Sequence, residues 1–135
     1  MATVSLFAFI LAALLGLTMA VLHFRGIKSG KALGIAHGLV ALSAVALLAT
    51  GLVLYGAGPA WWILGSFGVV ALGGAYLFSR QVRDEPWPAL VIVAHGGLAV
   101  VTIVALALWL GNRDEPRDTP TPGASASAET RPAPR

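Results

Sequence analysis

Two histidines occupy equivalent positions in two uncharged, apolar stretches of the sequence. Ala36-His37-Gly38 lies near the start of one stretch, and Ala94-His95-Gly96 lies near the start of the other. A neutral imidazole can ligate a metal ion, and it can also donate or accept a hydrogen bond or a proton. Because the local sequence is the same at both places, an interpretation of one histidine has to account for the other as well.

Few other reactive groups accompany the two histidines. None of the long apolar runs contains Asp, Glu, Lys or Arg, whereas proton- and ion-coupled transporters generally need such a group inside the membrane. No carboxylate is placed to orient a buried histidine, as a hydrolytic triad requires. The chain has no cysteine, which excludes disulfides and thiolate chemistry. We therefore expect that this protein is not an enzyme.

Four apolar runs carry the two histidines and determine the fold class. Of the 135 residues, 57% are hydrophobic and 11% are charged, whereas a soluble domain is about 25% charged. The mean hydropathy is +0.81. A run of roughly 20 apolar residues can cross a bilayer, and it should do so as a helix because lipid offers no partners for the backbone. The sequence therefore predicts an all-α, integral membrane four-helix bundle, with spans at 4–22, 32–55, 60–78 and 89–110.

The connections between the runs indicate the orientation in the membrane. Arg25 and two lysines lie between the first and second runs, and Arg80 and Arg83 lie between the third and fourth. The connection at 56–59 carries no charge. Because cytoplasmic loops are enriched in Lys and Arg, both basic loops are expected inside and both termini outside. We expect a bacterial inner membrane or a plasma membrane as the location.

The composition changes after the fourth run. Residues 112–135 contain five prolines and no large apolar residue, so this segment is predicted to be a disordered, Pro/Ala/Ser-rich extracytoplasmic tail. The chain then divides into a transmembrane domain at 1–111 and the tail at 112–135. The lipid bilayer is the expected surrounding, and no nucleic-acid partner is expected.

The order of the segments is itself repeated, because an apolar run, a basic loop and a histidine-bearing run occur twice. This predicts an up-down-up-down bundle formed by tandem duplication of a two-helix hairpin. In such a bundle the second and fourth helices are parallel and lie diagonally opposite each other. At 1.5 Å per residue, His37 and His95 should both lie roughly 8–9 Å inside the boundary. Neighbouring helices are 8–10 Å apart, so the diagonal of roughly 11–14 Å leaves room for a flat cofactor between the rings.

With these features the chain resembles small membrane-bound b-type cytochromes, in which histidines from different helices of a four-helix bundle ligate haem. The resemblance covers the four spans and rests on His37 and His95 in their Ala-His-Gly setting. It implies that these two residues are the axial ligands of one haem b, used for one-electron transfer. Thr102 would then line the site or hydrogen-bond the haem edge, and Arg25, Lys28, Arg80 or Arg83 would pair with the haem propionates.

The chain also departs from this family. The di-haem members place ligand pairs towards both membrane faces, whereas all three histidines of this chain lie towards the cytoplasmic side. At most one haem could therefore have two histidine ligands. His23, at the end of the first run, is expected at the membrane interface.

An alternative interpretation is a non-catalytic accessory or structural subunit of a larger membrane complex, or a homo-oligomer, without a cofactor. Duplication copies a histidine whatever its role, and an interfacial histidine can simply hydrogen-bond a backbone carbonyl or a lipid headgroup. The first run also carries Ala8, Ala12, Gly16 and Ala20 at every fourth position. Such small residues allow close packing, with helices of another protein as well as with its own.

Overall fold

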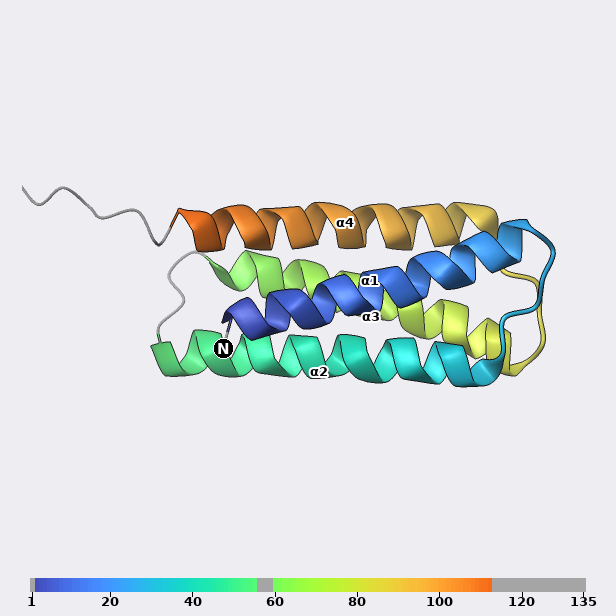
Figure 1. Cartoon of the computed structure of the whole chain (residues 1–135), viewed down its shortest axis with the longest axis horizontal. Coiled ribbons are helices and arrows are strands. Elements are labelled where there is room, and N and C mark those ends of the chain that lie inside the picture. Colours follow the sequence, from blue (N-terminus) through green and yellow to red (C-terminus); the bar gives the residue numbers. More distant parts are fainter. Residues whose placement is uncertain (1, 56–59, 113–135) are drawn as a thin grey trace, which may run out of the picture.

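The computed structural model describes residues 2–55 and 60–112, and these residues form four α-helices (Figure 1). The helices are α1 (Ala2–Phe24), α2 (Lys31–Tyr55), α3 (Trp61–Val82) and α4 (Ala89–Gly111). Each is long and apolar enough to cross a membrane. The predicted all-α class and the four membrane-compatible helices are thus confirmed. The connection at 56–59 and the predicted tail beyond Asn112 lie outside the described residues.

Helix α3 continues past the end that the hydropathy pattern predicted. The third apolar run ends at Phe78, but α3 continues to Val82 and includes Arg80 in its last turn. The Arg80 Nε donates to the carbonyl of Pro86 at 2.8 Å, and its Nη1 pairs with Glu85 at 3.2 Å. A long basic side chain can extend its charged end towards the membrane surface, so the helix need not stop where the apolar residues stop.

The ends of α1 and α3 have the same backbone geometry. Gly26 follows α1 with φ 71°, and Asp84 follows α3 with φ 56°. In each case the N–H of this residue donates to the carbonyl three positions earlier, and the next N–H donates to the carbonyl five positions earlier. This pair of bonds is a Schellman motif, which ends a helix at a left-handed residue. The two motifs are 58 positions apart, as are His37 and His95.

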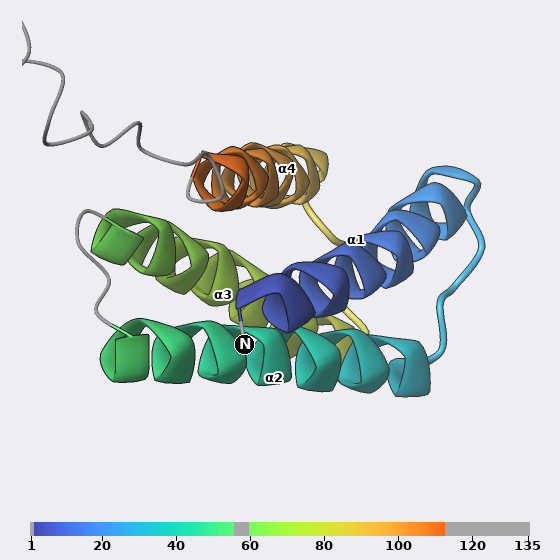
Figure 2. The same cartoon turned by 60° about the vertical axis from the view of Figure 1, so that its left-hand side comes forward.

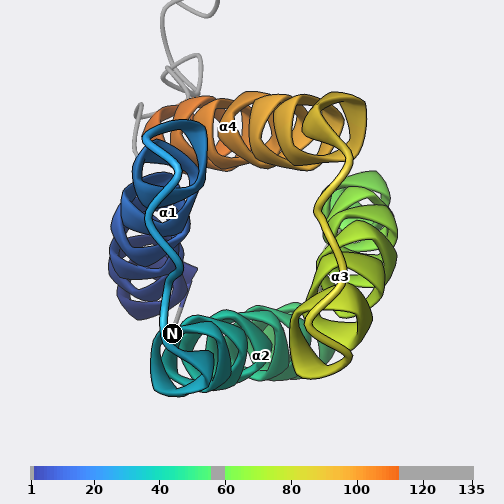
Figure 3. The same ribbon diagram turned by 90° about the vertical axis from the view of Figure 1, so that its right-hand side faces the viewer.

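The four helices are arranged as a square when the bundle is viewed along its length (Figure 3). Each of α1 and α3 packs against both α2 and α4, so α2 and α4 lie across the square from each other. The α1–α2 loop and the α3–α4 loop both lie at the end that faces the viewer in Figure 3. We call this the loop end.

The helices are not strictly parallel to one another (Figures 1 and 2). Helix α1 lies beside α2 at its start and approaches α4 towards the loop end. Helix α3 ends near the beginning of α2, where Gln81 contacts Ser29 and Gly30. Each hairpin therefore contacts the other hairpin at the loop end.

The packed core lies in the opposite half of the bundle. The rings of Phe9 and Phe67 stack there, with centroids 3.8 Å apart and planes 3° from parallel. Leu48, Ile63 and Leu106 pack into the same cluster and are almost fully buried. The outer surfaces are apolar as well, as expected where lipid rather than water surrounds the helices.

Candidate functional site

The rings of His37 on α2 and His95 on α4 meet inside the bundle. Their centroids are 6.3 Å apart, and the ring planes are inclined by 76°. Both rings are partly buried, between the packed core and the loop end. The structure thus brings together the two residues that the sequence pattern singled out, from helices that lie across the square from each other.

Each histidine is held by a hydrogen bond to the preceding helix. The Nδ1 of His37 lies 2.8 Å from the carbonyl oxygen of Ala12, and the Nδ1 of His95 lies 3.0 Å from that of Val70. Because a carbonyl oxygen can only accept, each Nδ1 carries the hydrogen, and the Nε2 of the neutral ring keeps a free lone pair. Histidines that ligate metals are oriented in this way, with the other ring N–H donated to a carboxylate, a carbonyl or water.

Glycines make room for the two rings. A Cβ added to Gly16 would lie 3.0 Å from Cε1 of His37, and one added to Gly74 would lie 3.1 Å from Cε1 of His95. Both distances are shorter than ordinary van der Waals contact, so an alanine at either position would press on the imidazole. Helices α1 and α3 therefore each provide a glycine beside which one imidazole fits.

Two cavities flank the histidine pair. The α1/α4 cavity has a volume of about 410 Å³, and the α2/α3 cavity has a volume of about 400 Å³. His37 and His95 line both, and the remaining walls are almost wholly apolar side chains and glycines. Volumes of this size are typical of small-molecule sites.

The geometry of the pair is compatible with one metal ion between the rings. A histidine nitrogen lies about 2.0–2.1 Å from a metal such as zinc, so two imidazoles on opposite sides of one ion have ring centres roughly 6 Å apart. His37 lies against α1 and His95 against α3, so the line joining the rings runs from the α1–α2 side to the α3–α4 side. The two cavities occupy the other two sides, where a flat ligand held between the rings would extend.

The other residues expected to bind a cofactor lie elsewhere. Thr102 is buried, and its hydroxyl donates to the carbonyl of Leu98 at 2.8 Å in its own helix. Arg80 is engaged by Glu85 and by the loop backbone. Neither of them, nor Arg25, is among the described residues that line the two cavities. His23 lies at the loop end, where its ring stacks on Trp87 with centroids 5.3 Å apart.

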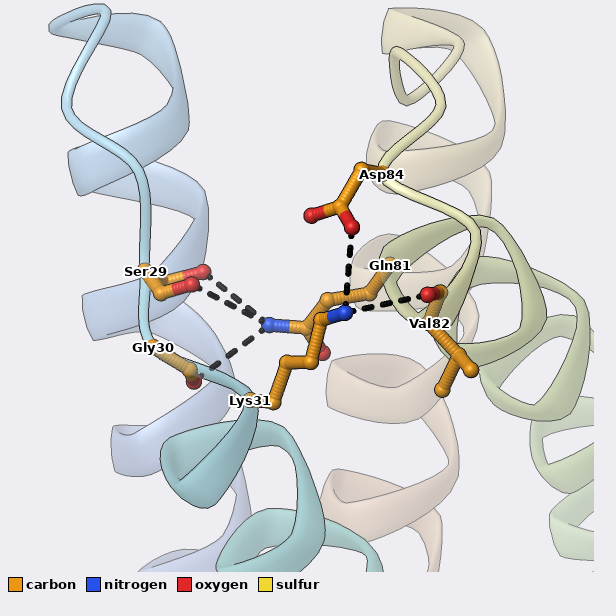
Figure 4. Close-up of polar contacts among 6 residues, drawn as sticks. All are labelled: Ser29, Gly30, Lys31, Gln81, Val82 and Asp84. Atoms are coloured by element: carbon orange, nitrogen blue, oxygen red, sulfur yellow. Dashed lines mark hydrogen bonds and ion pairs between the residues drawn. The ribbon is translucent and has the colours of Figure 1, made fainter.

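Gln81 is a polar residue of the site that the sequence reasoning missed. Only 7% of Gln81 is exposed, and it lines the α1/α4 cavity. Its Nε2 lies 3.4 Å from each of three acceptors, the carbonyls of Ser29 and Gly30 and the Ser29 hydroxyl (Figure 4). Its Oε1 is buried without a hydrogen-bond partner and packs against Gly34, where a Cβ would collide with it. The sequence offered one hint of a role for this residue, because Gln81 is the only glutamine of the chain.

A lysine joins the same parts of the two hairpins. Lys31 Nζ lies 3.1 Å from the carbonyl of Val82 and 3.1 Å from the carboxylate of Asp84 (Figure 4). Both side chains are more than half exposed, so the ion pair contributes at most about 1 kcal/mol. Its effect is to hold the end of α3 beside the beginning of α2.

No protein-family model matches the chain, and comparisons with curated proteins and with solved structures find no significant match.

Proposed function

We propose that this protein binds one b-type haem between His37 and His95 and serves as a membrane electron carrier. The observation that carries the proposal is the orientation of the two imidazoles. Each Nδ1–H is bound by a backbone carbonyl, each Nε2 keeps its lone pair, and the ring centroids lie 6.3 Å apart. Two imidazoles at this separation suit the two axial positions of one haem iron.

The number of ligands favours haem over a bare metal ion. Within the part of the chain that the structure describes, no group of three or more His, Cys, Asp or Glu residues could hold a metal ion. A metal held by two histidines alone needs further ligands, and a porphyrin brings four nitrogens of its own. The apolar walls of the two cavities suit the faces and edges of such a macrocycle.

When bound, haem supplies reversible one-electron chemistry at its iron. The chain's own residues then hold and surround the group. The carbonyls of Ala12 and Val70 fix the tautomer and the orientation of the two imidazoles. The apolar cavity walls keep water away, and a surrounding of low polarity is one of the factors that set the reduction potential.

The same proposal includes an up-down-up-down bundle made of two duplicated hairpins. Several pairs with like roles support it, because every pair is separated by the same 58 positions. They are the stacked rings of Phe9 and Phe67, the facing imidazoles of His37 and His95, the carbonyl acceptors Ala12 and Val70, the glycines beside the imidazoles (Gly16 and Gly74), and the residues with left-handed backbone (Gly26 and Asp84). Under this relation each hairpin contributes one ligand of a nearly symmetric site.

The basic loops favour an orientation in which the loop end faces the cytoplasm. The membrane would be a bacterial inner membrane or a plasma membrane. The haem then lies in the cytoplasmic half of the bundle, and both termini lie on the other side. The tightly packed half holds no further histidine among the described residues, so the proposal includes no second haem there.

The alternative is an accessory subunit of a larger membrane complex without a cofactor. One observation favours it, since the Nδ1 bonds already give each histidine a structural role in joining two helices. This role uses only one nitrogen of each ring, however, and it does not explain why the two rings face a common space. Co-purification of a partner protein with a colourless chain would support this alternative.

Absorption spectroscopy of the protein purified from haem-replete cells tests the proposal. We expect a Soret band with a stoichiometry of one haem per chain, and its loss in the His37→Ala, His95→Ala double variant. His23→Ala is the matched control, because it removes the one other histidine and should keep the band. A colourless wild-type protein, or a Soret band that persists in the double variant, would rule the proposal out.

A further inference from the structure

A polar pocket of about 360 Å³ lies at the loop end. It is lined by four residues of each loop together with His23 and Gln81. We call it the loop-end pocket. Gln81 and Trp87 line both this pocket and the α1/α4 cavity. The loop-end pocket therefore adjoins the space beside the two histidines, and a ligand in that cavity could extend a polar edge into it.

The charges around the loop-end pocket do not cancel. Asp84 is paired with Lys31 at 3.1 Å, and Glu85 is paired with Arg80 at 3.2 Å. Lys28 also lines the pocket and is exposed, and it makes no hydrogen bond or ion pair with another residue of the described ranges. Because both carboxylates are already neutralised, Lys28 leaves an excess positive charge that favours an anionic group.

Gln81 stands between the pocket and the cavity with its hydrogen bonds incompletely formed. Its three contacts through Nε2 are all 3.4 Å long, which is beyond the usual 2.7–3.2 Å of an N–H···O bond. Its Oε1 is buried without a partner. A carboxylate only accepts hydrogen bonds, so it cannot bond Oε1, but the weakly bonded Nε2–H₂ group can donate a shorter bond to it.

We propose that the loop-end pocket receives the acidic edge of the ligand held by His37 and His95, with Lys28 attracting the carboxylates and Gln81 hydrogen-bonding them. This inference rests on the proposed haem binding and adds the direction in which the cofactor is inserted. The acidic edge faces the loops, while the apolar body lies in the two cavities. Of the four cations expected to pair with the propionates, Lys28 lines the pocket, whereas Arg25, Arg80 and Arg83 are not among the described residues that line the pocket or the cavities.

The test compares protohaem with its dimethyl ester, which lacks both free carboxylates. Each is titrated into the full-length apoprotein in detergent, and the dissociation constant is obtained from the Soret band. The wild type should bind the free acid about fivefold more tightly than the ester, as expected for one partly exposed ion pair. Lys28→Gln should remove most of this preference, and Lys28→Glu should reverse it, while ester binding stays unchanged.

Arg25→Gln is the matched control, because it removes a loop cation three residues from Lys28 and should keep the preference. Gln81→Met should reduce the preference, measured as the ratio of the two dissociation constants. Equal affinities for acid and ester in the wild type would overturn the inference, and so would a preference that depends on Arg25 instead of Lys28. In both cases a Soret band that depends on the histidines leaves the haem proposal standing. If neither the acid nor the ester binds, the haem proposal and this inference are overturned together.

Discussion

At the scale of single residues, the site depends on what lies behind each imidazole as much as on the imidazole itself. A ring nitrogen bound to a carbonyl determines which nitrogen remains free, and a glycine at contact distance determines how close the ring can lie to the neighbouring helix. Ala12 and Gly16 provide these features for His37, and Val70 and Gly74 provide them for His95. The position of each ring is therefore set by the hairpin to which it belongs.

Substitution of one of these glycines tests this arrangement. In Gly16→Ala the new Cβ would lie 3.0 Å from Cε1 of His37 and would push the ring from its place. We expect haem affinity to fall about tenfold, in line with the 1–3 kcal/mol typical of overpacking. Gly68→Ala is the control, because a Cβ there meets no atom within 4 Å. Equal affinities of the Gly16→Ala variant and the wild type, measured by haem titration, would show that the ring contact has no role.

The sequence predicted the histidine pair but not its polar neighbour. His37 and His95 could be found because the tripeptide recurs at corresponding places in two apolar runs. Gln81 could not be assigned to the site, because its contact with Ser29 depends on how α3 ends beside α2. Thr102 was expected to line the site, but its hydroxyl bonds to the carbonyl of Leu98 in its own helix.

At the scale of the helices, hydropathy predicts where a helix crosses the membrane better than where it ends. The run ending at Phe78 predicted the apolar part of α3, but the helix continues to Val82, because Arg80 finds its partners in the following loop. The ends of α1 and α3 are set by backbone motifs instead, with Gly26 and Asp84 in the left-handed conformation. Such motifs leave little trace in an apolarity pattern.

The motif that ends α1 can be tested by removing its glycine. Gly26 has φ 71°, a conformation that costs a residue with a Cβ about 1–2 kcal/mol. Gly26→Ala should therefore lower the free energy of unfolding by about 1 kcal/mol, measured by denaturation in detergent. Gly30→Ala, in the same loop but without a positive φ or a nearby atom, should have little effect. An unchanged stability of the Gly26→Ala variant would argue against the left-handed turn.

At the scale of the whole molecule, the two halves of the bundle differ in what fills them. The half that contains Phe9 and Phe67 is closely packed, and the half towards the loops contains the histidine pair. The two cavities lie beside this pair, and the α2/α3 cavity extends as far as Phe9 and Phe67. The sequence predicted the membrane class and the four helices, because apolar length and missing charge follow directly from composition. The cavities could not be predicted, because they depend on the inclination of α1 and α3 across the square.

The orientation of the bundle can be tested with single cysteines, since the chain has none of its own. Ile27→Cys lies in the α1–α2 loop, and Asn112→Cys lies after α4 at the other end of the bundle. A membrane-impermeant thiol reagent applied to intact cells should label Asn112→Cys and leave Ile27→Cys unlabelled until the membrane is opened. Labelling of Ile27→Cys from outside would show the opposite orientation, with the histidine pair in the outer half of the membrane.

The most direct test of the central claim is the electron paramagnetic resonance spectrum of the oxidised protein with and without one of its two ligands. Wild-type protein should give a low-spin ferric signal, because two imidazoles complete the coordination of the iron. His95→Ala should give a high-spin signal that returns to low spin when imidazole is added, and His23→Ala should resemble the wild type. A high-spin signal from the wild type, or a low-spin signal that persists in His95→Ala without added imidazole, would contradict ligation by His37 and His95.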